Sequence, residues 1–392
     1  MKRLELLFAM AWTCSTALMA QDGGEVDSVR TAHRIALDAV PSTIFHTSPY
    51  LKGGNEETRT MNHDMTMTLK YAFMNRDEQR PGSLHYGAYQ GVGVAYHDFN
   101  PSLSNPVSVF LYQGAPIVNF SRRLSLNYEW SLGMAFGWKA YDEETNPDNH
   151  VIGSKVTAYI DVDFYMRYVL SRHFDINAGV SLSHFSNGNT SYPNEGLNTG
   201  GIRVGLAYYM NRQPLPAQRV KREMSDFRHG FYTDVVAYGA WRRRGVYDNG
   251  AGYLLPNAYA VVGLNVNPMY RLNPWFSAGA SLDVVYDRSA NLGDNYDDLL
   301  TAYEGGKVNR AFYRQTAVGL SARTEFAMPY FSINFGIGTN VIGNRGDMKG
   351  VYEILALKIH VTRNAMLHIG YSLTDFKTPS NLMLGVGWRF WH

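Results

Sequence analysis

Apolar and polar side chains alternate with a period of two along much of the chain. In the segment 65–73, every second residue is apolar, and Thr, Lys and Ala lie between them. The segments 158–168 and 331–341 show the same alternation. Successive side chains of a β-strand point to opposite faces of a sheet, so each segment has one apolar and one polar face. The pattern predicts about sixteen β-strands after residue 20.

The lengths of the connections distinguish a soluble β-sandwich from a barrel. Short and long connections alternate, and Asn, Asp and Gly are concentrated in the long ones. The short connections lie at 121–123, 171–173, 272–274, 328–329 and 362–365, and the long ones near 49–62, 139–153, 187–197, 244–256 and 288–310. This alternation is typical of outer-membrane barrels, whose periplasmic turns are short and whose external loops are long. We therefore predict an all-β protein, a transmembrane antiparallel β-barrel of the outer membrane of a Gram-negative bacterium.

A polar segment at 212–229 separates a first half, 21–211, from a second half, 230–392. It contains Pro214, Pro216 and several basic residues, and we predict a solvated periplasmic connector. An internal repeat relates the halves, because GVSLSHFS at 179–186 aligns with GYSLTDFK at 370–377. The second copy has Asp375 for His184 and Lys377 for Ser186, so we interpret the second half as a degenerate repeat.

The composition and the N-terminus limit the class of protein. Residues 1–20 are predicted to be a secretory signal, with two basic residues, an apolar stretch and small residues ending at Ala20. The only cysteine, Cys14, lies in this segment. The net charge of +2 and the 14% of aromatic residues argue against a nucleic-acid-binding protein and against a disordered chain. No run of 18 apolar residues follows residue 20, which excludes membrane-spanning helices.

Charged residues on the predicted strands have two expected roles. Four charged residues lie in the polar phase of their strands, namely Asp161, Asp163, Arg167 and Asp175. We expect them to form ion pairs inside the barrel. A basic run, 242–244, ends a strand at the predicted external rim. A solvated rim is the favoured interpretation of this run, and contact with lipopolysaccharide phosphates is the alternative.

The candidate chemistry lies in SHFSNGNTSYPNEGLN, residues 183–198. His184 and Ser186 continue the apolar phase of their strand, so we expect both to face outward, close to the external rim. Residues at i and i+2 stand about 7 Å apart on one face, which lets the imidazole accept the hydroxyl proton. An isolated pair of this kind more often marks only the point where the apolar band ends.

The following strand adds a third member. Its apolar phase makes Asn198 face outward, and pairing of Ile202 with Val180 places Asn198 beside His184. The side-chain oxygen of Asn198 can hold one ring nitrogen of His184 as a donor and leave the other free to act as a base. Three neighbours can donate hydrogen bonds to an oxyanion, namely Asn187, Gly188 and Asn194.

These residues resemble the outer-membrane lipid A 3-O-deacylases of the PagL type. The resemblance rests on H-F-S-N-G-N and the following P-N-x-G-L-N, and it is close over 183–198. It implies a barrel that hydrolyses an ester-linked acyl chain of lipid A in the outer leaflet. It also implies that His184 is the base, that Ser186 is the nucleophile and that the asparagines contribute to an oxyanion hole.

The chain departs from this family at the third member and in size. The family's acid lies fourteen residues after the histidine, where this chain has Asn198. Outer-membrane phospholipase A is similar in having H-x-S-N-G with an Asn at that spacing, so we retain Asn198 and keep Glu195 as an alternative acid. The deacylases have eight strands, and this chain has about twice as many. One enlarged barrel of about sixteen strands is our first prediction, and two tandem eight-stranded barrels are the alternative.

We predict an outer-membrane lipid esterase that removes an ester-linked acyl chain from lipid A by a Ser-His mechanism. Its expected partner is lipid A or lipopolysaccharide of the outer leaflet, with no nucleic acid, and the sequence leaves both a monomer and a homodimer open. One alternative is a phospholipase A-type acyl hydrolase, which by that resemblance would use calcium. The other is a non-catalytic pore or scaffold. The spacing of the His residues predicts no metal site, and we expect no other cofactor.

Overall fold

The computed structural model describes residues 31–392, apart from 81–82, 84, 189, 217–228, 249–250, 329 and 376–377. The predicted signal segment, 1–20, lies outside the described residues, as does Lys377 of the repeat. No described helix is long and apolar enough to cross a membrane.

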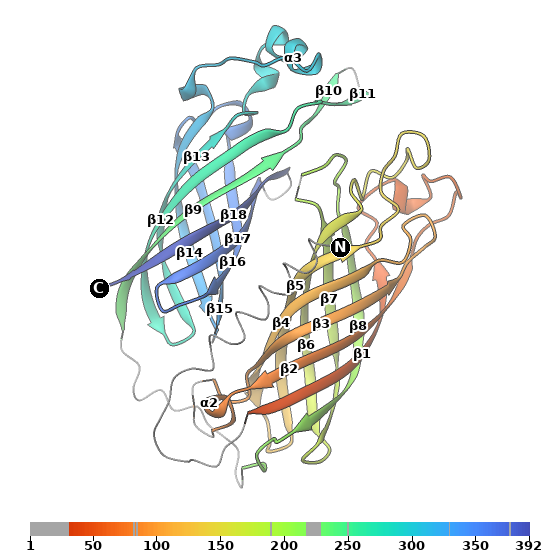
Figure 1. The fold of residues 1–392 in the computed structure, drawn as a ribbon, viewed down its shortest axis with the longest axis vertical. Helices are drawn as coiled ribbons and strands as arrows, with labels where there is room; N and C mark the ends of the chain where they lie inside the picture. The colour runs from red at the N-terminus through yellow and green to blue at the C-terminus, as the bar shows by residue number, and fades with distance from the viewer. Residues whose placement is uncertain are drawn as a thin grey trace, which may run out of the picture. The chain divides into compact units, whose positions relative to one another are not determined.

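The first eight strands form a closed antiparallel barrel (Figure 1). Each strand pairs with the next in the chain, and the last strand pairs with the first, for example Leu37 with Leu206. The strands are β1 (Ala32–Ile44), β2 (His63–Met74), β3 (Tyr89–Asp98), β4 (Val107–Asn119), β5 (Leu124–Phe136), β6 (Val156–Val169), β7 (Phe174–Ser186) and β8 (Leu197–Met210).

A second closed barrel of eight strands follows in the chain (Figure 1). Its strands are β9 (Gly230–Arg242), β12 (Tyr259–Asn273), β13 (Phe276–Asp287), β14 (Thr316–Ala327), β15 (Phe331–Ile342), β16 (Val351–His360), β17 (Ala365–Thr374) and β18 (Thr378–Trp391). β18 pairs with β9 and closes this barrel. A small hairpin, β10 (Gly245–Asp248) and β11 (Ala251–Leu254), extends the loop between β9 and β12.

Short helical segments occupy the connections. The α-helices are α2 (Arg76–Gln79) and α3 (Tyr296–Tyr303), and the 3-10 helices are η1 (Tyr50–Lys52), η2 (Leu292–Asp294), η3 (Phe312–Arg314) and η4 (Gly346–Met348). In the first barrel, the connections 45–62, 99–106, 137–155 and 187–196 share one end, which we call the loop end. The opposite end, the turn end, carries two short turns and the longer connection 75–88.

The prediction of a single barrel of about sixteen strands is wrong, and the alternative of two eight-stranded barrels is correct. A single barrel would pair β8 with β9, whereas β8 pairs with β1 and thus satisfies its backbone groups within the first sheet. One large barrel and two small barrels would both show alternating apolar and polar side chains and alternating short and long connections. The sequence pattern therefore could not separate them.

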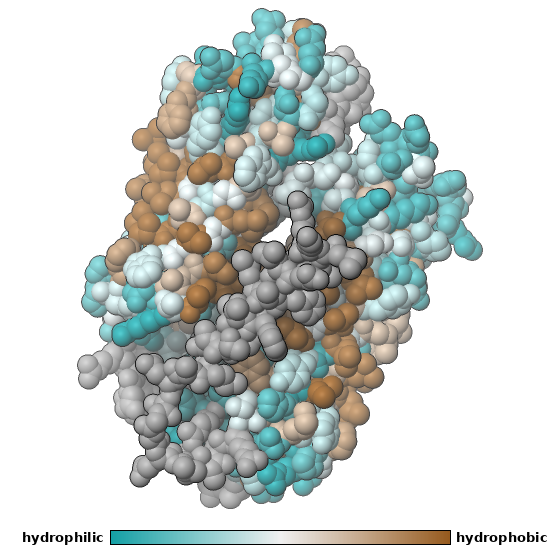
Figure 2. Space-filling model, in the orientation of Figure 1, coloured by the Kyte–Doolittle hydropathy of each residue, from teal (hydrophilic) through white to brown (hydrophobic). Residues whose placement is uncertain are grey.

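The predicted alternation holds along most strands, with interruptions in β4 and β16. On β7, Ile176, Val180 and Leu182 are exposed on the outer face, and Asp175 and Asn177 are buried in the interior. Figure 2 shows hydrophobic residues over the strands and hydrophilic residues over many of the loops. The apolar phase of the strands therefore makes the outer surface of a barrel, and the polar phase fills its interior, as expected for a barrel in lipid.

The interior of the first barrel contains a buried ion cluster. The guanidinium of Arg203 on β8 bonds Asp38 on β1 at 2.9 Å and Glu129 on β5 at 3.0 Å, and it also bonds Asp163. Lys70 on β2 lies 3.1 Å from Asp38. The cluster thus joins the last strand to the first by side chains, in addition to the backbone pairing.

The second barrel has a corresponding cluster. Arg389 on β18 bonds Asp234 on β9 at 2.7 Å, and Lys358 on β16 bonds the same carboxylate at 2.7 Å. Both barrels therefore link an aspartate of the first strand to an arginine of the last. The sequence predicts that Asp161 forms an ion pair. Its Oδ1 instead accepts hydrogen bonds from the hydroxyls of Ser181 (2.7 Å) and Ser183 (2.8 Å).

The start of the predicted connector is held inside the turn end of the first barrel. Arg212 donates to both carboxylate oxygens of Asp175 at 2.7 Å and to the carbonyl of Ser171 at 2.6 Å. Its guanidinium also lies 4.1 Å from the ring centre of Tyr209. The prediction of a solvated segment is therefore wrong for Arg212. Its side chain is drawn inside because the buried carboxylate of Asp175 requires a partner. Residues 217–228 of the connector lie outside the described part.

Replacement of Arg203 by alanine should destabilise the first barrel by about 3–5 kcal/mol, because it leaves the buried carboxylates of Asp38 and Glu129 without this partner. Urea unfolding of the full chain in lipid vesicles, with amide exchange in β1 and β8 as the readout, measures the effect. The control is Arg123→Ala at an exposed turn position, which should change the free energy by less than about 0.5 kcal/mol. An Arg203→Ala chain as stable as this control would contradict the role of the cluster.

Candidate functional site

The candidate residues lie where β7 and β8 meet at the loop end of the first barrel. His184 and Ser186 end β7, and Asn198 is the second residue of β8. The register pairs Val180 with Ile202 and His184 with Asn198, which confirms the pairing predicted from the sequence. Since Val180 and Ile202 are exposed on the outer face, His184 and Asn198 share this outward phase.

The imidazole of His184 is held by the side chain of Asn198. Nδ1 of His184 lies 2.6 Å from Oδ1 of Asn198. A carbonyl oxygen can only accept, so this contact assigns the proton to Nδ1 and leaves Nε2 unprotonated in the neutral ring. The pair therefore presents the tautomer in which Nε2 can act as a base.

The hydroxyl of Ser186 lies among donors of the loop 187–196. The side-chain Nδ2 of Asn194 donates to Ser186 Oγ at 2.9 Å, and the backbone N of Gly188 donates to the same atom at 3.1 Å. Asn194 is fixed in turn by the backbone N of Asn187, which donates to its Oδ1 at 2.9 Å. Two N–H groups thus converge on the hydroxyl oxygen of Ser186, beside the position where the carbonyl oxygen of a bound ester would become negative.

Among the described residues, the side chains of the candidates Asn187 and Glu195 form no hydrogen bond to Ser186 or His184. The side-chain Nδ2 of Asn187 donates to the carbonyl of Ser191 at 2.9 Å, so this amide serves the loop itself. Glu195 is exposed, and its backbone N donates to the carbonyl of His150 at 3.1 Å. Asn198, and not Glu195, is therefore the side chain that contacts His184 in the described residues. No hydrogen bond directly joins His184 to Ser186 there, a separation that is common before substrate binds.

Sequence reasoning missed Phe45, which lies beside the site. Its backbone N donates to the carbonyl of Asn198 at 2.9 Å. A Cβ atom added to Gly200 would lie 2.8 Å from the tip of the Phe45 ring, so this ring lies over Gly200. Phe45 follows β1 and reaches β8 only because the barrel closes, and no local pattern in the sequence could indicate the contact.

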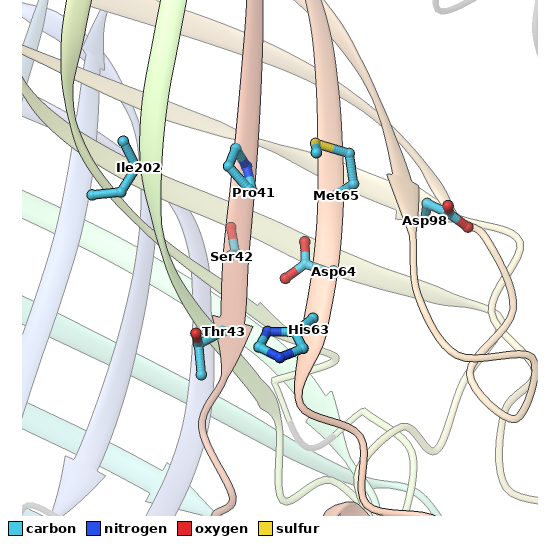
Figure 3. A pocket seen from close by; sticks show the side chains of 8 residues that line it. All are labelled: Pro41, Ser42, Thr43, His63, Asp64, Met65, Asp98 and Ile202. Carbon is cyan, nitrogen blue, oxygen red and sulfur yellow. The ribbon is translucent and has the colours of Figure 1, made fainter.

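A groove of about 540 Å³ lies on the outer face of the first barrel, along β1, β2 and β8 (Figure 3). Six of its lining residues are exposed, which places the groove outside the barrel: Pro41, Thr43, His63, Met65, Asp98 and Ile202. Ile202 lies four positions after Asn198 in the same phase of β8. The groove therefore lies on the same outer surface as the candidate site, close to it along β8.

Comparison with known families agrees with this geometry. Residues 113–207, which include Ser186, His184 and Asn198, match the family described as lipid A 3-O-deacylase (PagL). Residues 231–392 match the family described as acyloxyacyl hydrolase, C-terminal domain (PagL_C). The chain is therefore similar to the PagL family in two separate parts. Its two matches fall on the first and the second barrel respectively, and the predicted resemblance is confirmed.

Many solved structures are similar to the chain, and two of them have a TM-score of 0.31. One is a crystal structure of the outer membrane enzyme PagL, with 12% identity and a TM-score of 0.31, covering 43% of this chain and 97% of that one. The other is a crystal structure of Neisserial surface protein A, with 12% identity and a TM-score of 0.31, covering 45% of this chain and 97% of that one. No curated protein sequence matches the chain.

The second barrel differs at the corresponding position. β17 and β7 are each the seventh strand of their barrels, so both copies of the predicted repeat lie on equivalent strands. Asp375, which aligns with His184, follows β17 with φ of 53°, and its Oδ1 accepts a hydrogen bond from the backbone N of Val351 at 3.0 Å. This aspartate therefore serves a turn, and the His-Asn pair is a feature of the first barrel.

The arginines at the end of β9 are mostly paired. Arg242 lies 3.2 Å from Asp287, and Arg244 bonds Asp347, whereas Arg243 is exposed. Burial alone would raise the pKa of Asp347, but the hydrogen bond and charge of Arg244 hold this pKa below its ordinary value. Within the described residues, no group of three or more His, Cys, Asp or Glu side chains is arranged to hold a metal ion.

Proposed function

We propose that this protein resides in the outer membrane and removes an ester-linked acyl chain from lipid A, with Ser186 as nucleophile and His184 as base. The observation that carries the proposal is the 2.6 Å contact of His184 Nδ1 with Asn198 Oδ1 on the outer face, two residues from Ser186. The ester bonds of lipid A lie between hydrocarbon and headgroup. A site on the outer face at the loop end, which we take as the external side, meets bonds at that depth.

The first half of the reaction forms an acyl-enzyme. His184 Nε2 takes the hydroxyl proton while Ser186 Oγ attacks the carbonyl carbon of the ester. The contact with Asn198 keeps the second proton on Nδ1 and holds the ring in orientation as the imidazolium forms. The N–H groups of Gly188 and Asn194 now bonded to Ser186 Oγ stabilise the tetrahedral oxyanion after small shifts.

The second half releases the products. The tetrahedral intermediate collapses, the bond between the acyl carbonyl carbon and the sugar oxygen breaks, and this leaving oxygen takes the proton from His184. Water then attacks the acyl-enzyme, with His184 again as base, and the fatty acid leaves with regeneration of the Ser186 hydroxyl. Every proton of the proposed reaction moves through His184.

The groove on the outer face supports the choice of a lipid substrate. Along β2, the apolar Met65 lies farther from the loop end than the polar His63, and along β1 the apolar Pro41 lies farther from it than Thr43. This order matches an amphiphile whose acyl chain runs into the bilayer and whose polar part stays at the surface. We propose that the groove receives an acyl chain of the lipid.

Ser186→Ala should abolish deacylation, with a loss of at least about a thousandfold in rate, because no other group in the mechanism can form the acyl-enzyme. Mass spectrometry of lipid A incubated with the purified protein measures the loss of one acyl chain. Ser183→Ala is the matched control, since the hydroxyl of Ser183 faces the interior and donates to Asp161. This control should retain activity.

The same assay separates the other functions. Lysophospholipid formed from defined phospholipids, dependent on Ser186 and abolished by EDTA, would identify a phospholipase A-type enzyme in place of a deacylase. Deacylation of lipid A that persists in EDTA is the result expected for the proposed mechanism. If neither lysophospholipid nor deacylated lipid A forms, the result would favour the interpretation as a non-catalytic pore or scaffold.

Two replacements of Asn198 should change the rate of deacylation in opposite directions. Asn198→Leu should lower kcat by about a hundredfold, because Nδ1 loses its acceptor and the ring loses its orientation. Asn198→Asp should raise kcat up to about tenfold, because a carboxylate stabilises the imidazolium better than an amide does. Steady-state deacylation kinetics with lipid A vesicles give both values. A Leu variant as active as the unmodified chain would exclude Asn198 from the mechanism.

Ile202→Trp should fill part of the groove and shift the preference toward shorter acyl chains. We expect the ratio of kcat/KM for a long-chain ester to that for a short-chain ester to fall about tenfold. Val204→Trp, on the same face of β8 but outside the lining of the groove, is the matched control. Equal effects of the two substitutions would show that the groove does not select the acyl chain.

A further inference from the structure

The loop 187–196, which carries the donors around Ser186, is bound by a second loop, 137–155, between β5 and β6. The backbone N of Gly196 donates to the carbonyl of Val151 at 3.1 Å, and that of Glu195 donates to the carbonyl of His150 at 3.1 Å. The hydroxyl of Ser191 donates to the carbonyl of Gly153 at 2.9 Å. Three residues of the loop 187–196, which we call the site loop, are thus hydrogen-bonded to one short stretch, 150–153.

The backbones of the two loops also touch. A Cβ atom added to Gly153 would lie 1.9 Å from the carbonyl oxygen of Pro193, so only glycine fits at this position without a shift. The position of the stretch 150–153 therefore determines where the site loop can lie.

One buried side chain holds this stretch. Asn149 is fully buried, and its Oδ1 accepts hydrogen bonds from the backbone N of Val151 at 3.2 Å and of Ile152 at 3.1 Å. Its Nδ2 donates to the carbonyl of Lys139 at 2.9 Å. A single amide thus shapes the turn that follows it and attaches this turn to the start of its own loop.

The attachment reaches the imidazole through Gly196. This residue has φ of +73°, and a Cβ atom added to it would lie 3.1 Å from His184 Cε1. The backbone of Gly196 therefore lies against the ring of His184. Because Val151 holds the N–H of Gly196, the path from Asn149 to His184 consists of two hydrogen bonds and one packing contact.

A second path leads toward Ser186. Ser191, which bonds Gly153, also accepts through its carbonyl a hydrogen bond from the side chain of Asn187 at 2.9 Å. Asn187 follows Ser186 directly, and its backbone N fixes Asn194, the donor to Ser186 Oγ. Both the base and the nucleophile are therefore supported from the stretch 150–153.

We propose that Asn149 is a positioning residue for the esterase site, acting on His184 through Val151 and Gly196 and on Ser186 through Gly153 and Ser191. This inference rests on the proposed function. Asn149 touches neither Ser186 nor His184, so its contribution is to the geometry of the reacting groups. A displacement of about 1 Å between reacting groups lowers the rate of a reaction up to about a hundredfold.

The test compares Asn149→Ala with Glu143→Ala, an exposed position of the same loop that makes none of the bonds to 187–196. For Asn149→Ala we expect kcat for lipid A to fall about 10- to 100-fold, with KM within about threefold, because the groove on β1, β2 and β8 is untouched. Ser191→Ala, which removes only the bond to Gly153, should give a smaller fall in kcat. Glu143→Ala should match the unmodified chain.

Amide hydrogen exchange supplies a readout that does not depend on activity. In Asn149→Ala, exchange should accelerate in 187–197 and stay unchanged in the central part of β7. Unchanged exchange in 187–197, or faster exchange with unchanged kcat, would overturn the proposal. If the unmodified chain deacylates no lipid, the proposed function fails, and the exchange result still decides whether Asn149 holds the site loop. If Asn149→Ala does not fold, Ser191→Ala decides by the same two measurements.

Discussion

Each eight-stranded sheet closes on itself, and this closure is the constraint on which the rest of the structure depends. In hydrocarbon, an open edge would leave a row of backbone N–H and C=O groups without partners, which is costly. β8 removes the edge of the first sheet by pairing with β1, and β18 removes that of the second by pairing with β9. With eight strands, the circumference admits side chains but no wide channel. The interior polar groups must then satisfy one another, as the clusters around Arg203 and Arg389 do.

Closure also determines where chemistry can occur. The filled interior leaves no room for a lipid, whereas the outer face of β7 and β8 is apolar up to Leu182 and becomes polar at His184. The proposed nucleophile and base lie at this boundary, where an amphiphilic substrate would also change from apolar to polar. The loops above the strands then supply what the strands cannot, namely backbone N–H groups free of the sheet, such as that of Gly188. In the proposed mechanism, the strands orient the imidazole and the loop stabilises the charge.

The second barrel shows that the fold and the site are separable. It has the same strand count and the same link between first and last strand, but Asp375 serves a turn at the position of His184. A closed barrel is stabilised by its own backbone and interior, so the outward residues at the rim can change without loss of the fold. In the first barrel, the loop 187–196 is hydrogen-bonded to the neighbouring loop 137–155.

The sequence by itself determined the strands, the phase of each side chain and the register that places Asn198 beside His184, because alternation and parity are local properties. It could not determine that β8 pairs with β1 instead of β9, since both closures have the same pattern of residues and turns. The insertion of Arg212 beside Asp175, the support of the site loop by Asn149 and the ring of Phe45 over Gly200 were equally out of reach. Each of these contacts joins segments that are distant in sequence, and only the closed tertiary structure brings them together.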